Sequence, residues 1–290
     1  EMRRICMELC NIAVVKELLS RHGFRFSKAL GQNFLIDAQV PYDIAAASGA
    51  DETCGVLEIG PGIGCLTDQL CRRAGKVVSV ELDSRLYSVL GETMAAYPHF
   101  TLIRGDAMKL DFTQVVQEQF GGLTPVLCAN LPYNITTPIL TKIVESGVFE
   151  SLTVLIQKEV AQRICAKPGT ADYGAFTLLM QYYTEPELLF FVPPTAFLPA
   201  PKVTSAVLYC RTRKTPAVQV SDEAAFWRTV RAGFALRRKT LVNSLQTGWN
   251  LPKDVLADAI TACGFAPDIR GERLSLADYA ALTEELLKRA

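Results

Sequence analysis

The feature that most constrains the fold of this chain is a regular alternation of short apolar runs and helical stretches between residues 50 and 160. The apolar runs are rich in Val, Ile and Leu and alternate little with polar residues, which is typical of strands buried on both faces of a parallel sheet. Strands that alternate with helices in this way predict a doubly wound α/β domain. The predicted strands are residues 55–60, 76–83, 100–106, 125–131 and 151–157.

Two more strand-like runs, 187–193 and 205–213, flank the proline-rich segment 193–203. A crossover between parallel strands needs about a dozen residues and usually a helix, and this segment has no helical pattern. We therefore expect an antiparallel pair at the edge of a mostly parallel, seven-stranded, Rossmann-like sheet.

From residue 212 onward, apolar residues recur with the helical period and no strand pattern is present, which predicts a small all-α domain. The expected domains are therefore residues 1–211 and 212–290. The first is expected to begin with a helical extension over residues 1–30. Its segment "MRRICMELCNIAVVKELL" has a basic start, but Glu8 interrupts the apolar run, so an amphipathic helix is favoured over a signal peptide.

Composition excludes several classes of protein. Hydrophobic residues make up 49% and charged residues 21%, which indicates a globular chain with a full-sized core. The net charge is zero, so nucleic-acid binding would depend on a local basic patch. The nine cysteines form no C-x-x-C pair and only two histidines are present, so we expect no metal site and a reducing cytoplasm. No apolar run approaches the roughly 20 residues that span a bilayer.

The first predicted strand runs into "LEIGPGIGCLT", a glycine-rich turn that opens directly into a helix. Gly60, Gly62 and Gly64 allow a tight turn and the close approach of a ligand. A dinucleotide-binding turn has the spacing G-x-G-x-x-G, whereas Cys65 occupies the position where that pattern would continue. The turn therefore indicates a nucleotide-like ligand without a bound pyrophosphate.

Acidic residues end the next two strands. Glu81 follows Gly60 by 21 residues, where a carboxylate can accept both hydrogen bonds of a ribose diol. Asp106 closes the third strand and could accept a bond from the amine of an adenine. Each acid alone could be a solvated turn residue. The glycine-rich turn, Glu81 and Asp106 lie at the carboxyl ends of successive strands. Together they favour an adenosine-containing ligand, and S-adenosylmethionine fits better than NAD.

The fourth strand ends in Asn130-Leu131-Pro132-Tyr133, which could be a strand followed by an ordinary turn. Beside such a cofactor, the same residues suit methyl transfer to adenine N6. The Asn130 side-chain oxygen and the Leu131 carbonyl can each accept one N6–H bond, which concentrates electron density on that nitrogen. Pro132 fixes the backbone direction, and Tyr133 offers a flat face for an extruded base. No separate general base is required.

Several motifs together resemble those of the small-subunit ribosomal RNA adenine dimethyltransferases, whose loss gives kasugamycin resistance in bacteria. The resemblance extends from about Gly23 through "RGERLSLADYAAL". The macrolide-resistance enzymes that methylate large-subunit RNA share the fold but usually carry Ile in place of Leu131, so they are the second candidate; DNA adenine methylation is a third. The motifs are "KALGQNFLID", "LEIGPGIGCLT", "VELD", "GDAM", "NLPYNITTP", "QKEVAQR" and "FLPAPKVTSAV".

The resemblance implies an activity and a set of site residues. The expected activity is dimethylation of N6 on two adjacent adenosines in a hairpin loop near the 3′ end of 16S rRNA, within a pre-30S particle, by a cytoplasmic monomer. S-adenosylmethionine would be converted to S-adenosylhomocysteine without a metal. The implied catalytic residues are Asn130, Leu131, Tyr133 and Phe197, with Phe197 covering the base opposite Tyr133. The implied cofactor residues are Asn33, Leu35, Gly60, Glu81, Asp106 and Asn130.

An RNA-binding face is expected in the helical domain, which has an excess of three positive charges from Thr212 onward. One helix is predicted around "WRTVRAGFALRRKTLVNSL", with Arg228, Arg231 and Lys239 beside its apolar stripe. A run of charges is often only a solvated face, yet phosphate contacts carry much of the affinity for RNA. A relative that kept the fold but acts only as an assembly or transcription factor is the alternative to an enzyme. The apolar stripe comprises Trp227, Val230, Phe234, Leu241 and Leu245.

Overall fold

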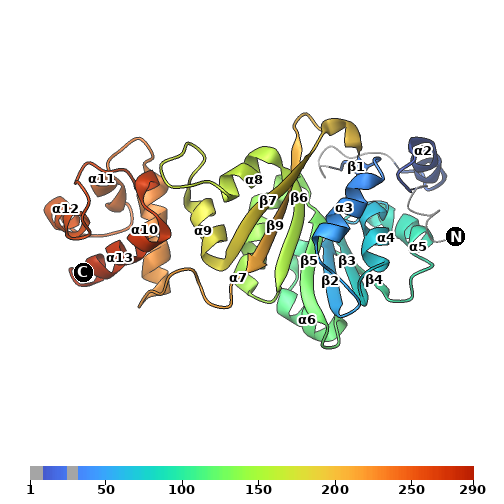
Figure 1. Cartoon of the computed structure of the whole chain (residues 1–290), viewed down its shortest axis with the longest axis horizontal. Coiled ribbons are helices and arrows are strands. Elements are labelled where there is room, and N and C mark those ends of the chain that lie inside the picture. The colour runs from blue at the N-terminus through green and yellow to red at the C-terminus, as the bar shows by residue number, and fades with distance from the viewer. Residues whose placement is uncertain (1–8, 25–31) are drawn as a thin grey trace. The chain divides into compact units, whose positions relative to one another are not determined.

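The computed structural model describes residues 9–24 and 32–290 (Figure 1). Contacts group the chain into two compact units. Of the described residues, the first contains 9–24, 32–161 and 185–212, and the second contains 162–184 and 213–290. The first unit holds a large sheet and the second is helical.

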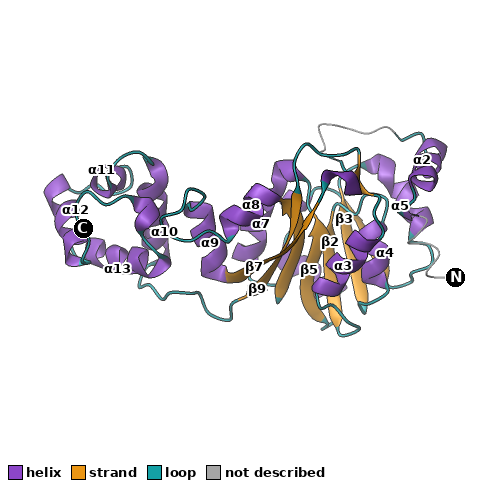
Figure 2. Ribbon diagram, turned by 45° about the horizontal axis from the view of Figure 1, so that its top comes forward, coloured by secondary structure: helices purple, strands orange, loops and turns teal. Residues whose placement is uncertain are grey.

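The first unit is built on a seven-stranded sheet with the strand order β4-β3-β2-β5-β6-β9-β7 (Figure 2). The strands from β2 to β6 are parallel to their neighbours, β9 runs antiparallel to β6, and β7 lies at the edge beside β9. The predicted fold class is confirmed. The strands are β2 Cys54–Ile59, β3 Lys76–Glu81, β4 Phe100–Arg104, β5 Thr124–Asn130, β6 Ser151–Gln157, β7 Thr184–Val192 and β9 Ser205–Thr212.

Helices cover both faces of this sheet. The α3 and α4 helices pack together on one face, and α6 and α7 pack together on the other, as right-handed crossovers on either side of β2 require. Asp111 begins α6 by accepting the backbone N–H of Thr113 and Gln114, and Gly147 ends α7 with a left-handed φ of 64°. The helices are α3 Gln39–Ala47, α4 Cys65–Cys71, α5 Tyr87–Thr93, α6 Phe112–Gln119, α7 Thr136–Ser146 and α8 Lys158–Ile164.

The predicted N-terminal helical extension lies partly outside the described residues, which begin at Leu9 and omit 25–31. Within them, α2 spans Ile12–Arg21 and begins where the Asn11 side chain accepts the backbone N–H of Ala13. Its apolar stripe packs into the core of the first unit, as an amphipathic helix should. The buried stripe comprises Val15, Leu18 and Leu19.

The second unit surrounds an aromatic core, and this core explains a correction to the predicted domain boundary. Residues 162–184 were expected in the first domain but group with the second unit. Within that segment, the Tyr182 ring stacks on Phe226 at 5.3 Å between centroids and meets Trp227 edge-on at 5.0 Å. The helices of this unit are α9 Ala175–Tyr183, α10 Glu223–Ala235, α11 Leu241–Leu245, α12 Lys253–Ala262 and α13 Leu276–Leu287.

The prediction of a single helix around residues 227–245 is wrong, because α10 and α11 are two separate helices. Leu236 leaves the helical region with φ −123° and ψ 69°. Its carbonyl accepts the Lys239 N–H at 2.8 Å, and the Leu241 N–H donates to Ile269 at 2.7 Å instead of continuing the helix. Lys239 is therefore in a turn and does not share a helix face with Arg228.

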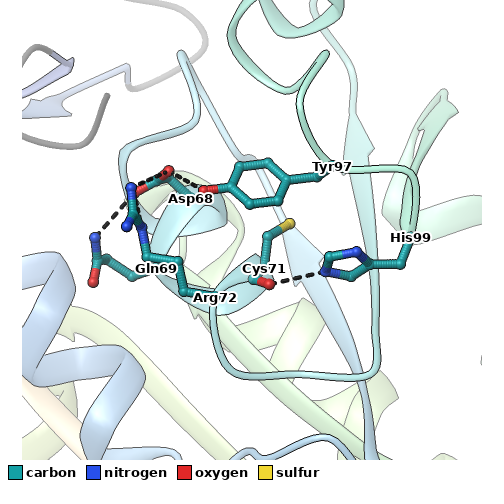
Figure 3. Close-up of polar contacts among 6 residues, drawn as sticks. All are labelled: Asp68, Gln69, Cys71, Arg72, Tyr97 and His99. Carbon is teal, nitrogen blue, oxygen red and sulfur yellow. Dashed lines mark hydrogen bonds and ion pairs between the residues drawn. The ribbon is translucent and has the colours of Figure 1, made fainter. Parts of the chain in front are cut away.

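A buried carboxylate anchors α4, the helix that follows the glycine-rich turn. The Asp68 side chain is fully buried in the first turn of α4. It accepts the Tyr97 hydroxyl at 2.5 Å, the Arg72 Nε–H at 2.9 Å and a Gln69 amide N–H at 3.0 Å (Figure 3). Tyr97 lies in the loop beyond α5, so this network joins α4 to that loop across 29 residues of chain. A buried charge with this many donors is stabilising only while all of them are present.

We predict that Tyr97→Phe lowers the free energy of unfolding by about 1.5–3 kcal/mol, because it removes one hydrogen bond to a buried charge. Urea denaturation followed by circular dichroism measures this change. Tyr42→Phe is the matched control, since the Tyr42 ring is 49% exposed and its loss of a hydroxyl should be nearly neutral. Equal unfolding midpoints for the two variants would contradict the role given to the network.

Candidate active site

A cavity of about 130 Å³ lies at the carboxyl ends of β2, β3 and β5 in the first unit. The register explains its position, because Ile59 pairs with Val80 and Asn130 pairs with Leu155, so the strand ends meet at one edge of the sheet. Most of the residues predicted to bind the cofactor or the target base line this cavity. They are Asn33, Leu35, Gly60, Glu81, Asp106, Asn130, Leu131 and Tyr133.

The glycine-rich turn forms the floor of the cavity. Gly60 and Gly62 have left-handed φ angles of 71° and 61°, a conformation that favours glycine. The Gly60 N–H donates to the Val80 carbonyl at 2.9 Å, which ties the turn to β3. A Cβ atom on Gly62 would lie 3.0 Å from the Phe34 ring, so the segment containing Asn33 and Leu35 can approach only a bare backbone.

Glu81 ends β3 with its side chain inside the cavity wall. It is only 5% exposed, and its Oε1 accepts the Asp83 N–H at 2.8 Å. Burial raises the pKa of the Glu81 carboxyl to about 7, although backbone bonds from Asp83 and Gly62 favour the ionised form. Acceptor capacity remains on this carboxylate for the two hydroxyl groups of a sugar.

A second buried acid, Glu58, lies under the turn. Its Oε2 accepts the Ser79 hydroxyl at 2.6 Å and the Thr67 hydroxyl at 2.7 Å. Burial raises the pKa of Glu58 to about 7, the two hydroxyl bonds oppose that shift, and the charge of Glu81 adds to it. These bonds connect β2 to β3 and to α4 directly beneath the glycines. The sequence analysis assigned no role to this residue, although it begins the turn motif.

The loop after β3 contacts the N-terminal segment on both sides of residues 25–31, a contribution that the sequence analysis missed. Asp83 accepts the Gln32 amide at 2.7 Å and Arg85 guanidinium bonds at 2.6 and 2.8 Å. These bonds hold the pKa of Asp83 below its usual range, with Arg85 the larger cause. The Arg85 guanidinium also lies 4.9 Å from the centre of the Phe24 ring. In the sequence, the only signal for this contact was Asp83, the final residue of the motif "VELD".

The adenine end of the predicted cofactor site combines an acid with an apolar surface. Asp106 begins a short 3₁₀ turn by accepting the Met108 N–H at 2.9 Å, and it lines the cavity. Leu82 lines the same region and is 55% exposed, so it offers an apolar surface there. A flat heterocycle could pack on Leu82 while its amine reaches Asp106.

The Asn130-Leu131-Pro132-Tyr133 segment is held by bonds to three neighbouring segments. The Asn130 Nδ2 donates to the Asn33 carbonyl at 3.4 Å, which leaves its Oδ1 available as an acceptor. The Leu131 N–H donates to Leu155 at 3.1 Å and fixes the direction of the backbone. The half-buried Tyr133 ring is oriented by a bond between its hydroxyl and Ser205 at 2.6 Å.

Phe197 lies in a short strand outside the seven-stranded sheet. It belongs to β8, Phe197–Leu198, which pairs antiparallel with β1, Phe34–Leu35. Its side chain is 2% exposed, lies in the apolar core and is not part of the cavity wall. The role implied for this ring, covering a base opposite Tyr133, stays a prediction. The pairing of Phe197 with Leu35, which the motif alone did not reveal, accounts for its burial.

Residues 9–24 and 32–290 contain neither a metal-binding cluster nor a membrane-spanning helix. Within those ranges, no group of three His, Cys, Asp or Glu side chains is arranged to hold a metal ion. None of the helices described there is both long enough and apolar enough to cross a membrane.

Comparison with known proteins identifies the family. Residues 23–288 match the family model described as ribosomal RNA adenine dimethylase. The chain belongs to this family. As a ribosomal RNA adenine dimethylase, it is a methyltransferase, in agreement with the resemblance noted from its motifs.

Two relatives of this dimethylase are similar over nearly their whole length. Ribosomal RNA small subunit methyltransferase A of Geobacillus thermodenitrificans (strain NG80-2) is 47% identical over 279 residues, covering 94% of both chains. The protein of the same name from Bacillus mycoides (strain KBAB4) is 46% identical over 277 residues, covering 94% of this chain and 95% of its own.

Two solved structures have a similar fold. The 23S rRNA methyltransferase ErmE is 26% identical with a TM-score of 0.66, covering 88% of this chain and 99% of its own. A dimethyladenosine transferase from Plasmodium falciparum is 24% identical with a TM-score of 0.73, covering 88% of this chain and 98% of its own.

We predict that the stability of the wild-type protein relative to Glu58→Gln falls as pH rises from about 5 to about 8. Burial raises the folded-state pKa of Glu58 from its ordinary value of 4.5 to about 7, so the folded state binds the proton more tightly. The stabilisation is therefore complete below the unfolded pKa and is lost as pH rises through the folded pKa. Urea midpoints at four pH values test this, and a difference that does not vary with pH would contradict it.

Proposed function

We propose that this protein transfers methyl groups from S-adenosylmethionine to N6 of two adjacent adenosines in a hairpin loop near the 3′ end of 16S rRNA. The observation that carries the proposal is the placement of Asn130 and Tyr133 on the wall of the cofactor cavity. Membership of the dimethylase family and the 47% identity to a small-subunit methyltransferase support it. Methylation of large-subunit RNA has weaker support. The sequence identity to ErmE is only 26%, and position 131 is Leu, as in the small-subunit enzymes, and not Ile.

The cavity residues fit S-adenosylmethionine. The buried Glu81 carboxylate would accept the two ribose hydroxyls, and Asp106 would accept the adenine amine beside Leu82. The left-handed turn at Gly60 has no side chain to occupy the space where the rest of the ligand would lie. Asn33 and Leu35 would contact the ligand from the N-terminal segment. The cofactor supplies an activated methyl group on a sulfonium.

The chemistry of the protein is positioning of the target amine. The Asn130 Oδ1 and the Leu131 carbonyl would each accept an N6–H bond, so that the nitrogen lone pair is directed at the methyl group. Each transfer would form an N6–CH₃ bond in place of the S–CH₃ bond of the cofactor, and one N6 proton, which is acidic once the nitrogen is methylated, would be lost to water. The Tyr133 ring would stack on the extruded base. Its hydroxyl, which is bonded to Ser205, would hold the ring in position.

RNA would be held by cations of the second unit. Arg231 is exposed on α10, while the Arg228 guanidinium lies 3.8 Å from the centre of the buried Trp249 ring, where it also supports packing. Lys239 lies in the turn after α10, next to the exposed Arg237. The cations on α10 and those in the turn after it would both contact phosphates. They would do so from two surfaces and not from one helix face.

The remaining partner assignments stay predictions. They are a pre-30S particle as the form of the substrate, a monomeric enzyme and a cytoplasmic location. The scattered cysteines, which include no C-x-x-C pair, are consistent with that location.

Methyl incorporation from tritiated S-adenosylmethionine tests the proposed function. Unmethylated small subunits should be labelled at N6 of two adjacent adenosines, in contrast to large subunits and DNA. Labelling of large subunits alone would establish the second candidate. Cofactor binding without labelling of any substrate would indicate a protein that only binds RNA.

We predict that Asn130→Ala lowers turnover about 10²–10³-fold, because it removes a preorganised polar contact that acts in the transition state. Tyr133→Ala should raise the KM for small subunits as well, since base stacking contributes roughly 1–3 kcal/mol. Tyr133→Phe, which keeps the ring face, should be mild. Single-turnover and steady-state kinetics distinguish these effects. The assigned roles are wrong if Asn130→Ala retains near-normal turnover, or if Tyr133→Phe is as impaired as Tyr133→Ala.

We predict that Arg231→Glu combined with Lys239→Glu weakens binding to small subunits and flattens its salt dependence, because fewer phosphate contacts release fewer counterions. Cofactor affinity and the unfolding midpoint should not change. Lys253→Glu is the control, since Lys253 is also exposed in the second unit but lies on α12. Binding at several salt concentrations that matches the control would show that these cations form only a solvated face.

A further inference from the structure

We infer that Phe191 and Lys158 form a second contact for the substrate RNA, which holds a nucleotide neighbouring the one whose adenine lies at Tyr133. The inference rests on the proposed function and extends it to a surface outside the cofactor cavity. The expected ligand is a nucleotide of a single strand, with its base on the Phe191 ring and its phosphate near the Lys158 ammonium.

The first observation is the exposure of Phe191. This ring is 49% exposed, although Phe190 and Val192 on either side of it pack into the core. Phe191 is the penultimate residue of β7, the edge strand of the sheet. It therefore faces solvent near the carboxyl end of the edge strand, where a flat group from outside can reach it.

The second observation is a cation above the ring. The Lys158 ammonium lies 4.9 Å from the centre of the Phe191 ring. In the part of the chain that the structure describes, no carboxylate forms an ion pair with this ammonium. A cation and an exposed aromatic ring are the two elements with which proteins hold single-stranded RNA, on the phosphate and on the base.

The third observation is continuity with the active site. Lys158 follows Gln157, the last residue of β6, which pairs with Ser205 of β9. The Lys158 N–H donates to the Thr204 carbonyl at 3.0 Å, and the Ser205 hydroxyl bonds Tyr133 at 2.6 Å. Only backbone pairing and one side-chain bond therefore separate Lys158 from the ring proposed to hold the target adenine.

This position explains why the partner would be a strand of RNA. A base extruded toward Tyr133 brings its neighbours along the same edge of the sheet. Tyr133 follows β5, and from β5 to β7 is three strand spacings, or roughly 14 Å, so a nearby nucleotide of the same strand can reach the Phe191 ring. Stacking on an aromatic ring does not depend on base identity, so this contact would place the strand without selecting its sequence.

The chain contains a matched pair for comparison. The Tyr42 ring is also 49% exposed, and the Arg73 guanidinium lies 4.8 Å from its centre. Arg73 lies just before β3, at the amino ends of the parallel strands and so at the edge opposite the cavity. Tyr42 therefore matches Phe191 in exposure and in its cation, but not in its place relative to the active site.

The test compares Phe191→Ala, Lys158→Gln and Tyr42→Ala in methylation of unmethylated small subunits and of free 16S rRNA. Phe191→Ala should raise the KM for both RNA substrates about 5- to 50-fold, as expected for a lost base stack, with kcat and cofactor affinity unchanged. Lys158→Gln should raise the KM less and reduce its salt dependence. Phe191→Tyr, which keeps the ring, should restore the KM, and Tyr42→Ala should match the wild type.

Several outcomes would overturn the inference without affecting the proposed function. One is a wild-type enzyme that methylates small subunits while Phe191→Ala behaves like Tyr42→Ala. Another is a raised KM for small subunits but not for free RNA, which would show that Phe191 contacts a ribosomal protein and not the RNA. A lowered unfolding midpoint or cofactor affinity in both Phe191→Ala and Phe191→Tyr would show a structural role. Failure of the wild type to methylate any small subunit would instead reject the proposed function.

Discussion

The parallel pairing of β2 with β3 and β5 is the constraint on which the rest of the active site depends. Because these strands point the same way and are buried on both faces, their carboxyl ends must open at one edge. Glu58 reinforces that arrangement by bonding hydroxyls of β3 and α4 beneath the glycine-rich turn. The acids and amide of the site then need no long loops to meet, since each is the last residue of a strand or lies just beyond one.

Local patterns were sufficient for the features that depend on local physics. Apolar runs without alternation identified the buried strands, and the positions of Glu81 and Asn130 at strand ends identified the cavity. Features that depend on contacts between distant segments were beyond that reasoning. Phe197 is buried because its strand pairs with Leu35, and residues 162–184 leave the first unit because Tyr182 packs on Phe226. The break after α10 similarly depends on a backbone bond to Ile269.

The two units divide the work that an RNA-modifying enzyme must do. The first contains the cavity, where buried acids with raised pKa values and a fixed amide suit a reaction governed by orientation. The second carries the excess of cations around an aromatic core that includes no residue of the cavity. Sequence alone located the charges but not their surfaces, because Arg228 is also part of the packing around Trp249.

The order of strands in the sheet has a consequence for synthesis of the chain. β9 lies between β6 and β7, so β7 is made earlier yet finds its neighbour only after residues 205–212 have been translated. Until then the nascent chain presents the apolar strand β6 as an open edge, the kind of surface that pairs with other chains. Ribosome pausing within the proline-rich segment before β9 would lengthen that exposure, whereas a circular permutant beginning after β7 would shorten it. The strand order therefore leaves β6 unpaired on one side between its own synthesis and that of β9.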